Sequence, residues 1–236
     1  MYSDVIDENF YSYLLHARER TYSYNLKKIK SFLPPSGKLL DIGAYCGVFM
    51  RTAKEMGYEV IGIEPSKWAS NEARKNTGDE VICGTLKDLR EDANNFDVIT
   101  MWDVFEHLSD PVGELKDIWL RLKPHGVLVL STMNMVNWFP KIMKEAYPWI
   151  LDKHLFYFNP KTLTSMLNKS GFELVCQKSY RHYISIEYLM YKLSSLGIPG
   201  ASLIEKLSKK SFISKWLVPV DFGDMETYVC KKIDKA

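Results

Sequence analysis

The chain has 236 residues, of which 46% are hydrophobic and 25% are charged, and its formal net charge is +2. This composition is ordinary for a folded domain, and without a dense stripe of lysine and arginine it argues against a dedicated nucleic-acid binder. The N-terminus lacks a signal-peptide pattern, and no apolar run reaches membrane-spanning length, so we expect a cytoplasmic protein. The 4 cysteines show no CxxC pair or metal-ligand spacing, so we expect free thiols and no metal site.

The first two-thirds of the chain alternate between helix-length segments and short apolar runs. An aromatic-rich, amphipathic stretch from about Phe10 to Phe32 predicts one or two helices, which the sequence PPSG ends. The apolar runs predict strands at Lys38–Ile42, Tyr58–Ile63, Glu80–Cys83, Phe96–Trp102 and Val127–Ser131. The segments between them predict helices at Val48–Met56, Ser66–Asn76, with Ser66 as N-cap, and Leu115–Leu122, which Pro124 and Gly126 end. Such alternation is typical of a parallel sheet covered on both faces, whose strand carboxyl ends share the ligand-binding edge.

The last third is more varied. The aromatic residues of Trp138–Trp149 favour a lid-like loop, Asn159–Gly171 predicts a helix, Phe172–Tyr180 predicts a strand, and Met225–Lys231 predicts a closing strand. Two amphipathic stretches, Glu187–Leu196 and Ser202–Leu207, lie between them. We expect these two stretches to pack against the sheet, with a substrate lid, an interaction surface or a peripheral membrane contact as alternatives.

The most informative segment is KLLDIGAYCGVFMRT, residues 38–52. A strand ends in an acid, Asp41, and the chain then passes through Gly43 and Gly47 into a helix, a turn that lets a ligand approach main chain with unpaired N–H groups. The next strand ends in Glu64, about twenty residues on, where a carboxylate can accept two hydrogen bonds from a ribose diol. Together they predict a nucleoside-binding βαβ unit.

A nicotinamide-dependent dehydrogenase is a less favoured alternative, because its first βαβ unit also ends in an acid. The GxGxxG pattern of such enzymes is absent, since Tyr45 stands between the two glycines and Phe49 follows them. That arrangement leaves no close backbone approach for a pyrophosphate.

Four blocks of sequence carry a resemblance to a known family. They are LLDIGAYCGVF at 39–49, YEVIGIEPS at 58–66, FDVITMWDVFEHLSDP at 96–111 and RLKPHGVLVLST at 121–132, and a fainter echo is HLFYFNPKTLTSMLNKSGF at 154–172. In this order and spacing they resemble the class I S-adenosylmethionine-dependent methyltransferases. The most similar branch is the small-molecule one, typified by ubiquinone-biosynthesis O-methyltransferases and by sugar and polyketide methyltransferases.

The resemblance implies a fold and a cofactor. The fold is α/β: a doubly wound, mostly parallel, seven-stranded sheet of the Rossmann-like methyltransferase type, with an antiparallel last strand and helical additions. We therefore expect one domain over residues 1–236, made of a helical lead-in at 1–36, a cofactor-binding core at 37–180, a helical insertion or lid at 181–220 and a closing strand at 221–236. The cofactor is S-adenosylmethionine, and the reaction is transfer of a methyl group to an oxygen or nitrogen of a small molecule such as a sugar, a quinone precursor or another metabolite.

The resemblance also implies which residues hold the cofactor. Asp41 would lie near the methionine amino group, Glu64, followed by Pro65, would hold the ribose, and the other contacts would come from the ends of neighbouring strands. These other residues are Gly43, Ala44 and Gly47 for the methionine portion, Thr85 and Leu86 for the adenine, and Trp102 and Asp103 closing over the cofactor.

The chain departs from the family pattern at two places. Tyr45 replaces a glycine or small residue of the cofactor loop, and Pro124-His125-Gly126 replaces Pro-Gly-Gly in a surface turn. The tyrosine leaves open a third reading, a catalytically silent relative that binds the cofactor or a partner.

Methyl transfer to oxygen is an in-line displacement that needs alignment, exclusion of water and a deprotonated acceptor. Histidine is the side chain best tuned to remove that proton near neutral pH. His154 is our preferred base, because it follows the fifth strand in an aromatic context, and His107, beside Glu106, is the second candidate. A packing or substrate-contact role for His154 is the alternative. The sequence specifies neither the acceptor nor the number of subunits.

Overall fold

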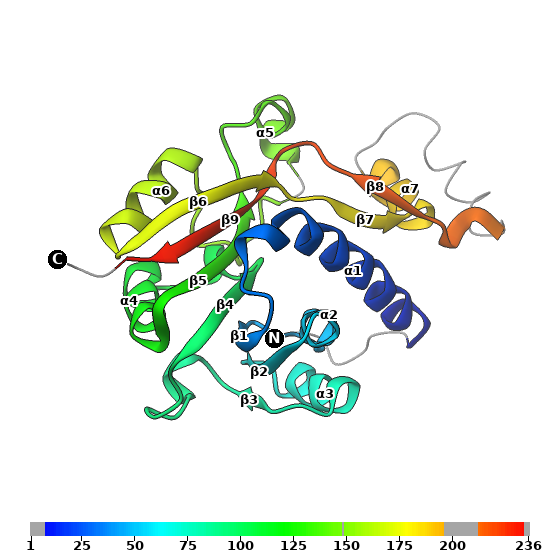
Figure 1. The fold of residues 1–236 in the computed structure, drawn as a ribbon. Helices are drawn as coiled ribbons and strands as arrows, with labels where there is room; N and C mark the ends of the chain where they lie inside the picture. Colours follow the sequence, from blue (N-terminus) through cyan, green and yellow to red (C-terminus); the bar gives the residue numbers. More distant parts are fainter. Residues whose placement is uncertain (1–7, 148, 196–211, 234–236) are drawn as a thin grey trace.

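A computed structural model describes residues 8–147, 149–195 and 212–233. Its centre is a seven-stranded sheet with the strand order β3-β2-β1-β4-β5-β9-β6 (Figure 1). The strands are β1 (Gly37–Ile42), β2 (Tyr58–Glu64), β3 (Val81–Cys83), β4 (Phe96–Trp102), β5 (Leu122–Met133), β6 (Phe172–Ser179) and β9 (Met225–Lys232). The first five pair in parallel, whereas β9 runs antiparallel to both β5 and β6. The expected doubly wound sheet with an antiparallel last strand is therefore confirmed.

Helices cover both faces of the sheet (Figure 1). One face packs against α1 (Glu8–Ile29), α2 (Val48–Glu55) and α3 (Lys67–Thr77), and the other packs against α4 (Pro111–Arg121) and α6 (Pro160–Lys169). Side chains alternate between the two cores along each buried strand. In β5, for example, Val129 belongs to the first core and Leu128 and Leu130 to the second. The central strands are therefore apolar throughout, which is why the sequence pattern reveals them so clearly.

Local signals set several of the helix boundaries. The side chain of Ser66 accepts a hydrogen bond from Ala69 N and caps α3 as expected, and Asp110 and Asn159 cap α4 and α6 in the same way. Proline is the first residue of both α4 and α6, where its missing N–H costs nothing.

Two boundary predictions are corrected by the structure. The helix expected to reach Leu122 ends at Arg121, and β5 begins at Leu122, well before the expected Val127. Phe96 pairs with Leu122 and Val98 with Val127, so the strand absorbs the extra residues as an irregularity in its pairing with β4. The start of β5 contains KPHG, which resembles a turn, so the sequence did not predict this part as strand.

The domain prediction expected a helical insertion or lid at 181–220. The described residues of this segment contain strands as well as a helix. They form a second, two-stranded antiparallel sheet of β7 (His182–Ser185) and β8 (Leu217–Val220), beside α7 (Ile186–Ser195) and a short 3-10 turn, η5 (Phe212–Lys215). Strands of 4 residues carry too little pattern to be recognised. The α7 helix matches the first predicted amphipathic stretch, and the second, Ser202–Leu207, lies outside the described residues.

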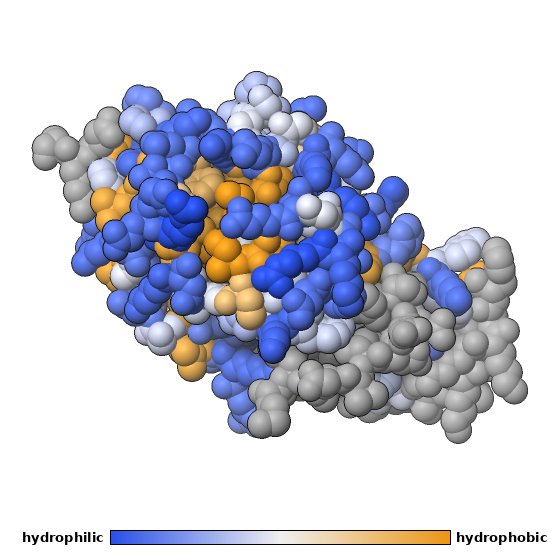
Figure 2. Space-filling view, turned by 90° about the horizontal axis from the view of Figure 1, so that it is seen from below, coloured by the Kyte–Doolittle hydropathy of each residue, from blue (hydrophilic) through white to orange (hydrophobic). Residues whose placement is uncertain are grey.

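The two-stranded sheet lies alongside α1, past the end of the main sheet (Figure 1). The face of the molecule shown in Figure 2 is largely hydrophilic, with one apolar area near its centre. No helix in the described ranges combines the length and the apolarity needed to cross a bilayer.

Candidate active site

The loop between β1 and α2 depends on its two glycines. Gly43 and Gly47 have φ angles of +79° and +78°, in the left-handed region that side chains disfavour. A Cβ on Gly43 would lie 2.3 Å from Cγ2 of Val104, so this position has no room for a side chain. The turn therefore brings bare main chain to the carboxyl edge of the sheet.

The expectation of unpaired N–H groups in this loop is wrong. The N–H groups of Gly43 and Ala44 both donate to the carbonyl of Ile63, at 2.8 and 2.9 Å, and Gly47 N donates to the carbonyl of Ala44. Because these donors are already paired with carbonyls of the loop and of β2, the loop offers a ligand close approach and shape rather than an anion-binding cluster.

Tyr45 adopts a left-handed backbone conformation, which glycine reaches without strain. Its φ is +47°, and its N–H donates to Oε2 of Glu64 at 2.9 Å. The guanidinium carbon of Arg18 lies 4.8 Å from the centroid of the Tyr45 ring. These contacts offset part of the cost of the left-handed conformation, so the bulkier loop keeps the turn that the family pattern expects.

Glu64 ends β2 and is held on both sides. Besides the bond from Tyr45, its Oε1 accepts a hydrogen bond from Ser66 N at 2.8 Å, where Pro65 leads into α3. Each carboxylate oxygen can accept more than one hydrogen bond, so both keep a free lone pair. The carboxylate is thus preorganised to receive two hydroxyl groups.

Asp41 lies in β1 and is only 2% exposed. Its Oδ1 accepts a hydrogen bond from Thr100 Oγ1 at 2.7 Å. Burial raises the pKa of this carboxyl to about 7, the hydrogen bond from Thr100 opposes the rise, and the charge of Glu64 adds to it. A cationic ligand group nearby would favour its ionised form.

The two residues expected to flank an adenine follow β3. Leu86 is 1% exposed and packs in the core, whereas Thr85 is exposed. The Thr85 hydroxyl lies 3.0 Å from Oδ2 of Asp88, which also accepts from Thr85 N. At this point the protein presents main chain and the Thr85 side chain, while Leu86 supports them from below.

Trp102 ends β4, Asp103 follows it, and the two side chains have different surroundings. The Trp102 ring is buried against Phe49, Tyr22 and Tyr180, with centroids 5.2 to 5.8 Å apart, and its Nε1 has no partner within the described part of the chain. Asp103 has a φ of +57°, and its Oδ1 accepts from Ser131 Oγ at 2.6 Å. Of the two, Asp103 reaches the cavity beyond the strand end.

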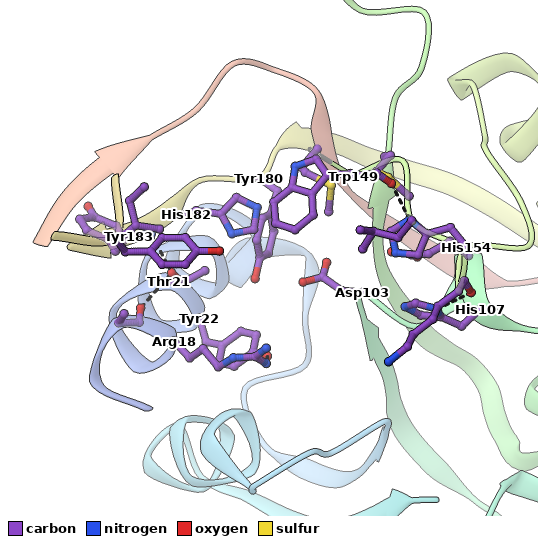
Figure 3. A pocket seen from close by; sticks show the side chains of 18 of the residues that line it. Arg18, Thr21, Tyr22, Asp103, His107, Trp149, His154, Tyr180, His182 and Tyr183 are labelled. Atoms are coloured by element: carbon purple, nitrogen blue, oxygen red, sulfur yellow. Dashed lines mark hydrogen bonds between the residues drawn. The ribbon is translucent and has the colours of Figure 1, made fainter. Parts of the chain in front are cut away.

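That cavity has a volume of about 500 Å³ and is formed by α1, the residues after β4, the 149–154 segment and β7. Figure 3 shows Asp103 in its middle, with Arg18 and Tyr22 of α1 on one side and His107 and His154 on the other. Among described residues of the Trp138–Trp149 stretch, only Trp149 lines this space. Five further lining residues were not predicted from the sequence, because nothing in their local sequence marks them: Arg18, Tyr22, Tyr180, His182 and Tyr183.

The two histidines lie together with a buried carboxyl. Their ring centroids are 4.7 Å apart. Nδ1 of His154 lies 2.8 Å from the carbonyl of Trp149, and Nδ1 of His107 lies 2.9 Å from the carbonyl of Lys153. A carbonyl only accepts, so each Nδ1 carries the proton when the ring is neutral, and each Nε2 has a free lone pair.

The pKa values of His154 and Glu106 are shifted. Burial, and then the neighbouring His107, lower the pKa of His154, which favours its neutral form. Burial, and then the charge of Asp103, raise the pKa of Glu106, whose Oε2 also accepts from Thr132 Oγ1 at 3.0 Å. Perturbed titratable groups beside a cavity are typical of functional sites.

Glu106, His107 and His154 each offer one ligand atom, and these atoms lie within 4.8 Å of one another. The Nδ1 contacts with carbonyls are the outer-shell arrangement common around metal-binding histidines, so these side chains can hold a divalent ion. No metal site was expected from the sequence, because the cysteines show no metal-ligand spacing, and His154 lies far from Glu106 and His107 in the chain. The Glu106-His107 pair was the available signal.

Comparison with known proteins agrees with this architecture. Residues 14–177 match a family model described as a methyltransferase domain. A ubiquinone biosynthesis O-methyltransferase of Coxiella burnetii is 30% identical over 115 residues, covering 46% of this chain and 49% of that protein. One of Bradyrhizobium diazoefficiens is 32% identical over 108 residues, covering 43% and 41%. The chain thus spans about half the length of the curated relatives that it matches.

Solved structures share the fold at lower identity. A SAM-dependent methyltransferase from Archaeoglobus fulgidus aligns with a TM-score of 0.62 and 19% identity, over 94% of this chain and 99% of that one. A cyclopropane synthase from Mycobacterium tuberculosis aligns with a TM-score of 0.56 and 19% identity, over 85% and 79%. Because the methyltransferase-domain model matches well over half of its residues, the chain belongs to the class I S-adenosylmethionine-dependent methyltransferases.

Proposed function

We propose that this protein transfers a methyl group to an oxygen or nitrogen of a small-molecule acceptor that sits in the cavity between α1, β7 and the 149–154 segment. The observation that carries the proposal is the position of the cavity. The cavity holds Asp103, which follows the last residue of β4, in its middle, and one of its walls holds two histidines and a buried glutamate. It therefore joins the expected cofactor edge to groups that can accept a proton.

The residues at that edge fit S-adenosylmethionine, which supplies a methyl group on a sulfonium. Glu64 would hold the ribose hydroxyls, and Asp41 would attract the methionine ammonium. The remaining positions, proposed from the resemblance, would line the rest of the cofactor: Gly43, Ala44, Gly47, Pro65, Thr85, Leu86, Trp102 and Asp103.

Arg18 extends this set. Its described contacts are the Tyr45 ring and a long, 3.5 Å hydrogen bond to the Tyr22 hydroxyl, and no ion pair of Arg18 occurs among described residues. A guanidinium at a cavity wall without a carboxylate partner is well suited to bind one. We assign it to the methionine carboxylate.

His154 is the proposed base. Its Nε2 receives the proton that the acceptor hydroxyl loses, while the Trp149 carbonyl holds Nδ1–H and fixes the ring. The lowered pKa of His154 keeps Nε2 unprotonated near neutral pH. The aromatic residues around the cavity exclude water, which would otherwise compete for the methyl group.

A second arrangement uses the same side chains. A divalent ion held by Glu106, His107 and His154 would lower the pKa of a bound hydroxyl and replace the base. The two arrangements differ in one measurable respect, dependence on divalent ions.

Calorimetry and a transfer assay test the proposal. S-adenosylhomocysteine should bind and NADH should not, which would set aside the dehydrogenase alternative. Radiolabelled S-adenosylmethionine should then label at least one member of a panel of phenols, sugars and amines. Cofactor binding without transfer to any acceptor would support the catalytically silent alternative instead.

We further infer that the protein works in a reducing compartment such as the cytoplasm. All four cysteines are described, and none of them forms a disulfide.

A further inference from the structure

His182 is the first residue of β7, and its imidazole forms part of the cavity wall (Figure 3). The Trp149 ring stacks against it with centroids 5.8 Å apart, and Tyr180 meets it edge-on at 4.8 Å. Two aromatic neighbours at these angles restrict the orientation of the imidazole. His182 is thus a fixed polar group in a largely aromatic wall.

One nitrogen of this imidazole is unused. Nε2 is buried and makes no hydrogen bond to any described residue. An unpaired buried polar atom destabilises the fold, and a ligand that pairs with it recovers that loss. Burial also lowers the pKa of His182, so a neutral imidazole is available, with one nitrogen to donate and one to accept.

The strand that carries His182 is fastened to α1 by buried side chains. Nδ2 of Asn25 donates to the Arg181 carbonyl at 2.8 Å, and Arg181 N donates to Oδ1 of Asn25 at 3.0 Å. On the other side, Tyr183 N donates to Thr21 Oγ1 at 2.8 Å. These bonds bracket His182, so its position is set before any ligand enters.

The cavity has polar groups at both ends, and aromatic rings and the Asp103 carboxylate lie between them. In Figure 3, His182 and Tyr183 lie at one end and His154 at the other, with Asp103 between them. The rings of Tyr22, Trp149 and Tyr180 line the space. Flat walls with a polar group at each end suit a ring that carries polar substituents at two positions.

We propose that His182 selects the acceptor by hydrogen-bonding to a second polar substituent of a hydroxylated, ring-shaped molecule, which turns the hydroxyl to be methylated toward His154. This inference rests on the proposed function and adds to it the class of acceptor and the residue that recognises it.

The test uses matched probes and three variants. The probes are catechol, resorcinol and hydroquinone against phenol, and methyl glucoside against its deoxy derivatives. His182→Phe keeps an aromatic ring between Trp149 and Tyr180 but removes both nitrogens, His182→Asn keeps a hydrogen-bonding group, and His16→Phe, at an exposed position of α1, controls for the substitution itself.

For the wild type we expect at least one two-hydroxyl probe to give a kcat/KM about tenfold above that of its one-hydroxyl counterpart. His182→Phe should abolish this preference, His182→Asn should restore part of it, and His16→Phe should leave it unchanged. None of these variants should alter the dissociation constant of S-adenosylhomocysteine.

A second measurement does not depend on turnover. With labelled histidine and bound S-adenosylhomocysteine, the imidazole resonance that His182→Phe removes should shift when a two-hydroxyl probe is added. An unchanged preference in His182→Phe, or no shift with any probe, would overturn the inference. Failure of S-adenosylhomocysteine to bind the wild type would instead overturn the proposed function.

Discussion

The two halves of the candidate site are built in different ways. The proposed cofactor half comes mainly from one βαβ unit, in which Asp41, Gly43 and Glu64 follow one another closely in the chain. The proposed acceptor half joins α1 to β7 through hydrogen bonds that span 156 and 162 residues. The first half is a local motif, and the second exists only once the whole chain has folded.

This difference teaches where the two kinds of specificity reside. A cofactor that a whole family uses can be bound by a short local motif. An acceptor pocket assembled from distant segments is free to vary, because scaffolds of this kind carry their binding residues on variable connections. Substitutions that affect one half and spare the other can therefore break or sharpen the distinction.

Replacing Glu64 with alanine should have the largest effect. Loss of two charge-assisted hydrogen bonds, about 3 kcal/mol in total, should weaken S-adenosylhomocysteine binding roughly 100-fold in calorimetry. Glu59→Ala, at an exposed position of the same strand, is the matched control and should bind normally. Glu64→Gln keeps the size of the side chain but only one accepting oxygen, because its amide nitrogen cannot accept from Tyr45 N or Ser66 N, so it should also bind weakly. Thermal melting of both variants and of the control shows whether folding is at fault. Normal affinity in Glu64→Ala would remove the basis of the proposed cofactor half.

Replacing His154 with asparagine should affect the acceptor half alone. We expect kcat to fall about 100-fold, as for loss of a general base, with the affinity for S-adenosylhomocysteine unchanged. Since burial and the neighbouring His107 lower the pKa of His154 from its usual value, the wild-type rate should rise with pH only in the acidic range and then level off. The variant should lose that acidic limb. A variant that keeps the limb would contradict the assignment of the base.

The dependence of the reaction rate on divalent ions distinguishes the two arrangements proposed for the same side chains. If His154 is a base, treatment with EDTA should leave the rate unchanged. If Glu106, His107 and His154 hold an ion, EDTA should abolish the rate and Mg²⁺ or Mn²⁺ should restore it. In the second case Glu106→Gln should weaken the response to the ion, and cofactor binding should be unaffected.

Replacing Thr100 with valine should shift a pH dependence. The pKa of Asp41 is about 7, so affinity for the ammonium of S-adenosylhomocysteine should rise as the pH increases through 7 and the carboxyl ionises. The hydrogen bond from Thr100 lowers the pKa of Asp41. Its removal should therefore move the midpoint of the binding curve to higher pH and weaken binding severalfold at pH 7. An affinity that does not vary between pH 6 and 8 would show that Asp41 does not face the ammonium.

Replacing Tyr45 with glycine should have the smallest effect. Glycine adopts a φ of +47° without strain, and the N–H that donates to Glu64 remains. We expect binding within about threefold of the wild type, because relief of backbone strain and removal of the ring beside Arg18 oppose each other, each by about 1 kcal/mol. A large gain in transfer activity on Tyr45→Gly would favour the catalytically silent alternative for the natural chain.

The same difference between the halves explains how far the sequence could be read. The sheet, the cap at Ser66 and the placement of Asp41 and Glu64 at neighbouring strands follow from periodicity and local spacing. The paired N–H groups of Gly43 and Ala44 do not, because their acceptor, the Ile63 carbonyl, belongs to the next strand. That geometry appears only when β1 and β2 lie side by side.

The acceptor half gave weaker signals. His154 and the Glu106-His107 pair were visible as residues, but their proximity depends on how the 149–154 segment folds back on the end of β4. Arg18 and His182 carried no signal at all, since an arginine on an amphipathic helix and a histidine in a 4-residue strand look ordinary. The long-range hydrogen bonds of Asn25 and Thr21, which we call the α1–β7 clamp, bring α1 and β7 to one cavity.

That clamp has a consequence for how such a protein diversifies. A substitution at Asn25, a residue that does not line the cavity, would move His182 and Tyr183 relative to the bound molecule and so change which molecules are accepted. Proteins that evolve from this chain would then bind new molecules in the cavity through changes in α1 alone, with Gly43, Asp41 and Glu64 unchanged.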